Sequence, residues 1–445
     1  MNRLLLVSAD SHITPPPAAV GEYLEAAYQP WFRDYLDENE AWLKILRFLA
    51  FPPEILEIID QERAIQTGGD LGWDVERRLF EMDREGVAAE LLIASTHAAA
   101  TPFFGYANRR YPADVRFAGT RAYHRWTADF MAAADGRLFA VALPGPCLDI
   151  DAAIAELRWA ADHGFRSVAV PGAVRDPLLP PLYSPYYEPY WATCAELGIV
   201  LSVHASHGRT QGTFMPFIQR VTAELGDEAT PQRIQNALGS GDFPDSPFAP
   251  DFNPQQVLWE LMVGGVFDRY PTLTIAFTEV RSDWAPATLR AFDTRFDRGD
   301  TPLTRRPSEY WQSNCMAGAS SIKRSEIRLR HEIGVDHLMF GRDYPHAEGT
   351  WPNTYDWLRD AFAEVPEDEA RLMLGENAVR CYALDREKLL AIAARIGPRP
   401  EDILGGAHDV RPELVAHFAA RAGYNKSMEN VDVDGLLARC TVPSA

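Results

Sequence analysis

The first residues of the chain form a short apolar run that ends in polar residues. Residues 4–7 are apolar, Asp10 and His12 follow, and three consecutive prolines begin at Pro15. A run this short, bounded by residues that break regular structure, is typical of a buried strand followed by a loop. We therefore expect polar side chains at the carboxyl end of a first strand.

Further along the chain, helical stretches alternate with short apolar runs, often with a glycine between them. Predicted helix, glycine and strand follow one another as 77–84, Gly86 and 91–94; as 150–162, Gly164 and 167–170; and as 189–197, Gly198 and 199–203. Further apolar runs fall at 138–143, 273–277 and 338–341. Apolar runs that alternate with helices are typical of parallel strands buried on both faces. The spacing predicts an α/β fold, a (β/α)-barrel.

Two stretches interrupt this alternation. The stretch at about 14–72 carries aromatic and charged residues with helical spacing, so we expect a helical insertion there. The stretch 207–253 is rich in Gly, Pro, Asp and Phe without clear periodicity, which predicts a long loop over one face of the barrel. We assign residues 1–384 to the barrel and 385–445 to a helical extension that packs on the barrel or on a partner subunit.

The composition is that of an ordinary globular protein, with 47% hydrophobic and 24% charged residues among 445 positions. The 63 acidic and 43 basic residues give a net charge of −20, which disfavours nucleic acid and anionic membranes as partners. Five scattered cysteines without a CxxC pair argue against a disulfide framework. No run approaches the roughly 20 apolar residues of a membrane span. We expect a cytoplasmic protein that acts on a small molecule.

Polar side chains follow several of the predicted strands. Asp10 and His12 follow the first strand, and His204, Glu279 and Asp343 follow later ones. Because all strands of a parallel barrel end on the same face, these side chains are expected to converge there. Asp10 and His12 are two residues apart on an extended segment and therefore point to the same side. Carboxylate and imidazole together suit zinc, iron or manganese, so we predict that these five residues bind a divalent metal.

The same face offers groups for catalysis. A divalent ion can lower the pKa of a bound water to about 7, and Asp343 could take the proton of that water and deliver it to a leaving group. Glu279 and His346 are further catalytic candidates. The candidates for substrate binding are His97, His207 and Arg281.

Each of these residues also has an ordinary structural role when it is taken alone. Asp10 or Asp343 could cap the helix that follows, and His204 could be a hydrogen-bonded core residue. Glu279 could pair with Arg281 in a salt bridge. The occurrence of all of them after separate strands is what favours a metal site.

Several motifs resemble the amidohydrolase superfamily, specifically the amidohydrolase-related subgroup that contains aminocarboxymuconate semialdehyde decarboxylase. The motifs are Asp10-Ser11-His12, Met82-Asp83-Arg84-Glu85-Gly86-Val87, Val203-His204, Phe340-Gly341-Arg342-Asp343-Tyr344-Pro345-His346 and Leu374-Gly375-Glu376-Asn377-Ala378. They lie within the stretch from residue 4 to about residue 384. The resemblance implies a distorted (β/α)8 barrel and a homodimer. It also implies a metal held by Asp10, His12, His204 and Asp343.

Two positions depart from the pattern of that family. The first-strand pair is Asp-x-His rather than His-x-His, and Glu279 stands where a histidine often falls. A glutamate there could join Asp343 or His346 in holding a second ion. We therefore expect one or two divalent ions per chain, with zinc first and iron or manganese as alternatives.

Three functions follow from these expectations. The first is a metal-dependent hydrolase in which activated water attacks a carboxylic derivative (an amide, ester, thioester or lactone) of a small aromatic or apolar molecule. The alternative is a metal-dependent non-oxidative decarboxylase of an aromatic or enoic acid. The third is a non-catalytic barrel that serves as a metal-binding or assembly scaffold. Two ions per chain would favour hydrolysis, and one ion would favour decarboxylation.

Overall fold

The centre of the computed structural model is a sheet of eight parallel strands. The strands are β1 (Leu6–Ile13), β2 (Val87–Ala94), β3 (Leu138–Ala142), β4 (Phe165–Ala169), β5 (Val200–His204), β6 (Ile275–Thr278), β7 (Cys315–Ser320) and β8 (Leu338–Gly341). Each pairs in parallel with the next in chain order. The structure describes residues 3–13, 15, 17–38, 73–94, 102–103, 111–172, 176, 178–205, 214–228, 233, 253–346, 349–405 and 410–421.

The sheet closes on itself and is buried on both faces. All residues of β1, β6 and β8 are buried, as their apolar runs predict. Ser11 of β1 forms a bridge with Tyr344, just beyond β8, and the backbone N–H of His12 donates to the Tyr344 carbonyl at 2.6 Å. The predicted (β/α)8 barrel is therefore confirmed.

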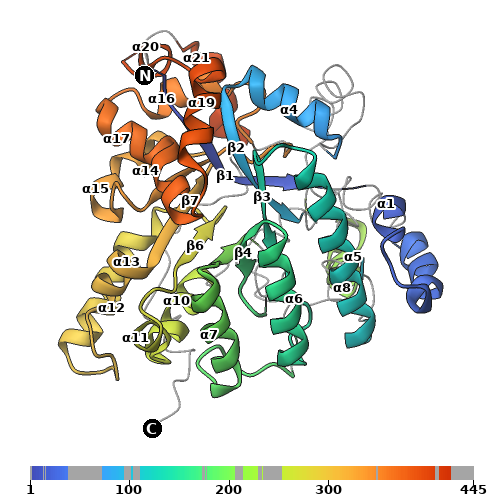
Figure 1. Cartoon of the computed structure of the whole chain (residues 1–445). Coiled ribbons are helices and arrows are strands. Elements are labelled where there is room, and N and C mark those ends of the chain that lie inside the picture. The colour runs from blue at the N-terminus through green and yellow to red at the C-terminus, as the bar shows by residue number, and fades with distance from the viewer. Residues whose placement is uncertain are drawn as a thin grey trace.

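Helices cover the outside of the barrel (Figure 1). They are α4 (Val75–Arg84), α5 (Ala113–Ala132), α6 (Ile150–Asp162), α7 (Glu188–Leu197), α10 (Asn253–Val263), α11 (Val266–Arg269), α12 (Trp284–Asp297), α13 (Pro307–Asn314), α14 (Arg324–Arg328), α15 (Arg330–Ile333) and α16 (Thr354–Ala361). The carboxylates of Asp74 and Asp149 cap α4 and α6 by accepting from backbone N–H groups. Gly198 ends α7 with a φ of 61°, a left-handed conformation that glycine adopts without strain.

The apolar core has two parts. The first lies between the strands and the outer helices and includes Trp191 and Trp311. The second fills the inside of the barrel, where Val7 packs together with Leu389 and Ile392 of α19. The first helix of the predicted extension therefore packs on the barrel, at the end where β1 begins (Figure 1).

The carboxyl-terminal part of the described chain is helical. Its elements are α17 (Glu367–Arg371), the π-helical turn η4 (Leu372–Glu376), α18 (Asn377–Cys381), α19 (Arg386–Ile396), α20 (Pro400–Ile403) and α21 (Pro412–Arg421). None of the helices in the described ranges combines the length and apolar character that crossing a bilayer requires.

The two insertions differ in how well the sequence predicted them. The described part of the first is helical as expected, with α1 (Pro17–Gly21), η1 (Ala26–Tyr28) and a helix over 29–38. In the second, α8 (Phe214–Leu225) and η3 (Gly226–Glu228) stand where we predicted a long loop. Phe214, Val221 and Leu225 recur at helical spacing, but the flanking glycines and prolines hide this period. The other residues of both insertions lie outside the described part of the chain.

Candidate metal centre

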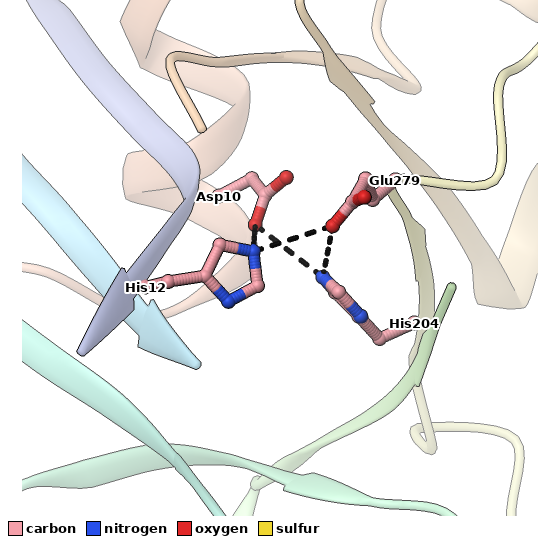
Figure 2. Close-up of side chains that lie close together, drawn as sticks. All are labelled: Asp10, His12, His204 and Glu279. Atoms are coloured by element: carbon pink, nitrogen blue, oxygen red, sulfur yellow. Dashed lines mark hydrogen bonds and ion pairs between the residues drawn. The ribbon is translucent and has the colours of Figure 1, made fainter. Parts of the chain in front are cut away.

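Side chains from four separate strands converge at the carboxyl end of the barrel. Asp10 and His12 lie on β1, His204 ends β5, and Glu279 directly follows β6. Figure 2 shows these four side chains pointing toward one another. Asp343 joins them from the segment that follows β8, because its Oδ1 lies 3.2 Å from His12 Nε2.

A bulge in β1 turns the two first-strand residues toward this point. The register of β1 against β2 shifts between Ser8 and Ser11. Before the shift, Val7 packs in the apolar interior of the barrel. An extra residue in one strand re-aims the side chains that follow it, so Asp10 and His12 face the interior after the shift. Strict alternation from Val7 would have turned both of them outward.

Four donor atoms form a first group: Asp10 Oδ1, His12 Nε2, His204 Nε2 and Glu279 Oε2. His12 Nε2 lies 3.2 Å from the Glu279 oxygen and 3.6 Å from the Asp10 oxygen. His204 Nε2 lies 2.7 Å from the former and 3.7 Å from the latter. Ligand atoms around a tetrahedral ion with bonds of 2.0–2.2 Å lie about 3.3–3.6 Å apart. The first group therefore has the dimensions of a site for one divalent ion.

A second group shares two residues with the first. It consists of His12, Glu279, Asp343 and His346. His346 Nδ1 lies 3.0 Å from Asp343 Oδ1. The rings of His12 and His346 stack, with centroids 3.8 Å apart and planes inclined by 17°. His346, a predicted catalytic residue, thus stands beside Asp343.

Two further features of the donor set suit a cation: its carboxylates are buried, and some of their oxygens accept no hydrogen bond from the described residues. Asp10 and Asp343 are fully buried, yet among the described residues no hydrogen bond reaches Asp10 Oδ1 or Asp343 Oδ2. Buried carboxylate oxygens normally have a partner, and a bound divalent ion would supply one. His204 Nδ1 contacts the Ala205 carbonyl at 3.0 Å. If Nδ1 carries the proton, the Nε2 lone pair faces the group, as metal binding requires.

The charges of the site perturb one another strongly. Burial raises the pKa of Asp343 well above its usual range, and Glu279 and Asp10 add to this rise although His346 opposes it. Burial alone would lower the pKa of His204, but the carboxylates of Glu279 and Asp10 raise it well above its usual range. Burial alone would raise the pKa of Glu279, but His204 and His12 hold it well below. Without a metal, protons held by Asp343 and His204 offset negative charge in the site.

The backbone is strained at two of the converging residues. Glu279 has a φ of 54° and Asp343 a φ of 56°, in the left-handed region that residues other than glycine rarely adopt. Such a conformation costs about 1–3 kcal/mol and persists only where the surrounding structure fixes it. Glu279 is the first residue after β6 and Asp343 the second after β8, so the backbone turns at both positions as the chain leaves the strand.

Two residues that contact Asp10 were not singled out from the sequence. The Ser320 hydroxyl donates to Asp10 Oδ2, and the Ser8 hydroxyl donates to the Asp10 carbonyl at 2.5 Å. Ser320 ends β7, a strand missing from the prediction because Cys315–Ser320 consists mainly of small residues. The regular alternation of strands and helices is the signal that could have revealed it, since a barrel needs a strand between β6 and β8.

Of the three predicted substrate-binding residues, Arg281 lies in the described part of the chain. Arg281 is buried, and its guanidinium pairs with Asp283 at 2.9 Å and with Glu326 at 3.4 Å. His97 and His207 lie outside the described residues. A role in substrate binding stays a prediction for all three.

Comparison with known proteins gives one family and a set of similar structures. The model of a family described as amidohydrolase matches residues 9–384. The search of curated proteins gives no match.

Three of the similar solved structures share 17–19% sequence identity with this chain. The 5-carboxyvanillate decarboxylase of Sphingomonas paucimobilis is 19% identical with a TM-score of 0.56, covering 86% of this chain and 100% of its own. An amidohydrolase of Mycobacterium avium subsp. paratuberculosis is 17% identical with a TM-score of 0.60, at the same coverages of 86% and 100%. A dihydroxybenzoic acid decarboxylase of a Polaromonas species, with bound manganese and 2-nitroresorcinol, is 18% identical with a TM-score of 0.55, covering 88% and 99%. At these identities, the likeness shows a common fold.

Proposed function

Because this chain belongs to the amidohydrolase family, we propose that it is a metal-dependent enzyme that removes carbon dioxide from an aromatic or enoic carboxylic acid without oxidation. The proposal takes up the alternative from the sequence rather than the first expectation, hydrolysis. Both reactions use the same donor atoms, and they differ in the number of ions expected per chain.

The observation that carries the proposal is the sharing of His12 between the two donor groups. The Nε2 atom of an imidazole has a single lone pair, so it binds one ion at a time. With His12 Nε2 within 3.2 Å of both Glu279 Oε2 and Asp343 Oδ1, the two groups compete for the same ligand. This geometry supports one ion per chain, the arrangement that favours decarboxylation.

In this proposal Asp10, His12 and His204 hold the ion together with Glu279 or Asp343. A bound divalent ion would anchor the carboxylate of the substrate and a neighbouring oxygen, and would stabilise negative charge on them. Manganese and zinc both suit such a donor set. The ion in one structurally similar decarboxylase is manganese.

The pair formed by Asp343 and His346 would handle the proton. Loss of carbon dioxide breaks a carbon–carbon bond and leaves the electron pair on the substrate carbon, which must then accept a proton. Asp343 Oδ1 and His346 Nδ1 lie 3.0 Å apart, so a proton has a short path from one group to the other. Because Asp343 is fully buried while His346 is partly exposed, His346 is the side from which the proton can be replenished.

The names of the similar structures give further support. Two of the three reported above are decarboxylases of substituted benzoic acids. A carboxylate beside a ring hydroxyl offers the two oxygens that one ion can hold. We therefore propose hydroxybenzoic acids as the first substrates to test.

The test combines metal analysis with a substrate panel in deuterium oxide. Protein purified without chelators is expected to hold about one ion per chain. Hydroxybenzoic acids should release carbon dioxide, and the product should carry deuterium at the ring carbon that held the carboxylate. Two ions per chain, together with hydrolysis of esters, amides or lactones and no carbon dioxide release, would overturn the proposal in favour of the hydrolase.

A further inference from the structure

The barrel closes at a junction that differs from its other strand contacts. Neighbouring strands from β1 to β8 pair through parallel ladders of several residues. In the described structure, β1 meets the segment after β8 through a single bridge between Ser11 and Tyr344. Two backbone hydrogen bonds accompany it, from His12 N–H to Tyr344 O at 2.6 Å and from Asp343 N–H to Asp10 O at 2.9 Å. Three of the candidate metal ligands thus meet at the junction with the fewest ladder contacts.

A buried group of charges lies directly against this junction. It consists of Arg78 on α4, Glu90 on β2 and Arg342 after β8, and each of the three has a relative exposure of 0%. Arg78 Nε donates to Glu90 Oε2 at 3.0 Å, and Arg342 Nη2 lies 2.5 Å from Glu90 Oε1. Glu90 therefore joins the two guanidinium groups, and we call these three residues the junction triad. Arg342 also pairs with Glu85 at 2.9 Å.

The junction triad reaches both sides of the junction. On the β1 side, Arg78 donates to the His12 carbonyl at 2.9 Å and to the Ser11 hydroxyl at 3.0 Å. On the β8 side, the ring of Tyr344 lies 5.1 Å from the guanidinium of Arg78 and 4.6 Å from that of Arg342. Tyr344 is thus in contact with both cations of the triad.

We propose that the junction triad positions the candidate metal ligands of β1 against Asp343, so that it sets the metal affinity of the site without touching the ion. A guanidinium donates in fixed, planar directions, and Arg78 uses three of them to tie β1 to β2. Glu90 keeps both cations in place because unpaired charges are costly in a buried environment. The inference rests on the metal centre of the proposed function but not on the reaction it catalyses.

A buried carboxylate elsewhere in the barrel provides a matched control. Glu156 on α6 is also buried and contacts His124 Nδ1 at 2.7 Å as well as Arg125. These contacts join α5 and α6 on the outside of the barrel. Glu90→Gln and Glu156→Gln each replace a buried carboxylate that joins two basic side chains.

The experiment titrates Co²⁺ into the metal-free wild-type protein and the two variants and monitors binding by visible absorption. Unfolding by denaturant is measured in parallel. Both variants should unfold more readily than wild type. Only Glu90→Gln should bind Co²⁺ more weakly, by about 10–100-fold, and show a shifted absorption spectrum. Glu156→Gln should keep the affinity within about twofold of wild type and the spectrum unchanged, because its contacts do not reach the ligands.

A milder variant tests the same role if Glu90→Gln fails to fold. Ser11→Ala removes one acceptor of Arg78 with little change in volume, and it should weaken Co²⁺ binding about fivefold. Wild-type affinity and spectrum in every folded junction variant would overturn the positioning role while leaving the metal centre intact. A wild-type protein that binds no Co²⁺ would instead overturn the metal centre, and the positioning role with it.

Discussion

The imidazole of His12 stands at the centre of the candidate site. Its Nε2 is shared by the two donor groups, and within the described residues its buried Nδ1 has no hydrogen-bond partner. Metal-binding histidines usually fix their ring by a hydrogen bond from the second nitrogen. If His12 binds the ion as proposed, its ring would be held instead by stacking on His346, and its backbone by the hydrogen bond from Arg78 to the His12 carbonyl.

A substitution at Asp343 tests the proton-handling role proposed for its carboxyl group. Asp343→Asn keeps the shape of the side chain but cannot take up and release a proton. Decarboxylation should fall by about 10²–10⁴-fold, the range that general acid–base groups contribute. The free energy of unfolding should change little, because Asn is neutral and burial already disfavours charge at this position.

The measurement is carbon dioxide release at saturating metal, with unfolding by denaturant as the check on folding. Asp149→Asn is a suitable control, since it alters a carboxylate that caps α6. A folded Asp343→Asn enzyme that keeps more than about a tenth of the wild-type rate would exclude Asp343 from proton transfer.

At the scale of elements, the close approach of β8 to β1 depends on a glycine. A Cβ atom on Gly341 would lie 2.8 Å from Asp10 Cβ and 3.1 Å from Ser320 Cα. Gly341→Ala should therefore displace Asp10, with a loss of about 1–3 kcal/mol in unfolding free energy and weaker metal binding.

The check is metal titration together with denaturant unfolding of the same protein. Gly264→Ala, between α10 and α11 on the outside of the barrel, is the matched comparison, because its Cβ would lie 2.8 Å from Tyr183 Cβ and would not press on a residue of the site. Equal metal affinity in the two variants would show that the approach of Gly341 to Asp10 does not matter for the site.

Some secondary-structure elements could be predicted from the sequence pattern and others could not. Strands such as β5 and β8 were predictable because a continuous apolar run between two helices is typical of a parallel strand buried on both faces. The bulge in β1 was not, since hydrophobic alternation carries no sign of a register shift set by the neighbouring strand. The sequence did not predict β7 because most of its residues are small, so they form no strong apolar run.

At the scale of the whole molecule, the barrel topology explains why the sequence could predict that residues far apart in the chain meet in one site. Once eight parallel strands form a closed barrel, residues that follow strands must meet on one face, as His204 and Glu279 do. The junction triad lay beyond such reasoning. Arg78, Glu90 and Arg342 come from a helix, a strand and a loop, and their contacts depend on side-chain packing that no spacing reveals.

The response of the whole protein to pH follows from the perturbed groups of the site. The folded-state pKa values of Asp343 and His204 are raised, so in the metal-free protein their contribution to stability is present below their unfolded values and is lost as pH rises through the folded ones. The pKa shift of Glu279 has the opposite sign. Its folded-state pKa is lowered, so its contribution to stability is lost only as pH falls. Above neutral pH the metal-free site should therefore lose stability as its protons leave.

A bound ion replaces those protons, so its stabilising effect should grow with pH. We expect the difference in thermal unfolding midpoint between protein with Mn²⁺ and protein with chelator to increase from about pH 6 to about pH 8. Asp343→Asn should flatten this increase because one of the titrating groups is gone. A difference that stays constant or shrinks over that range would mean that the ion does not compete with protons at these residues, and would place metal binding elsewhere.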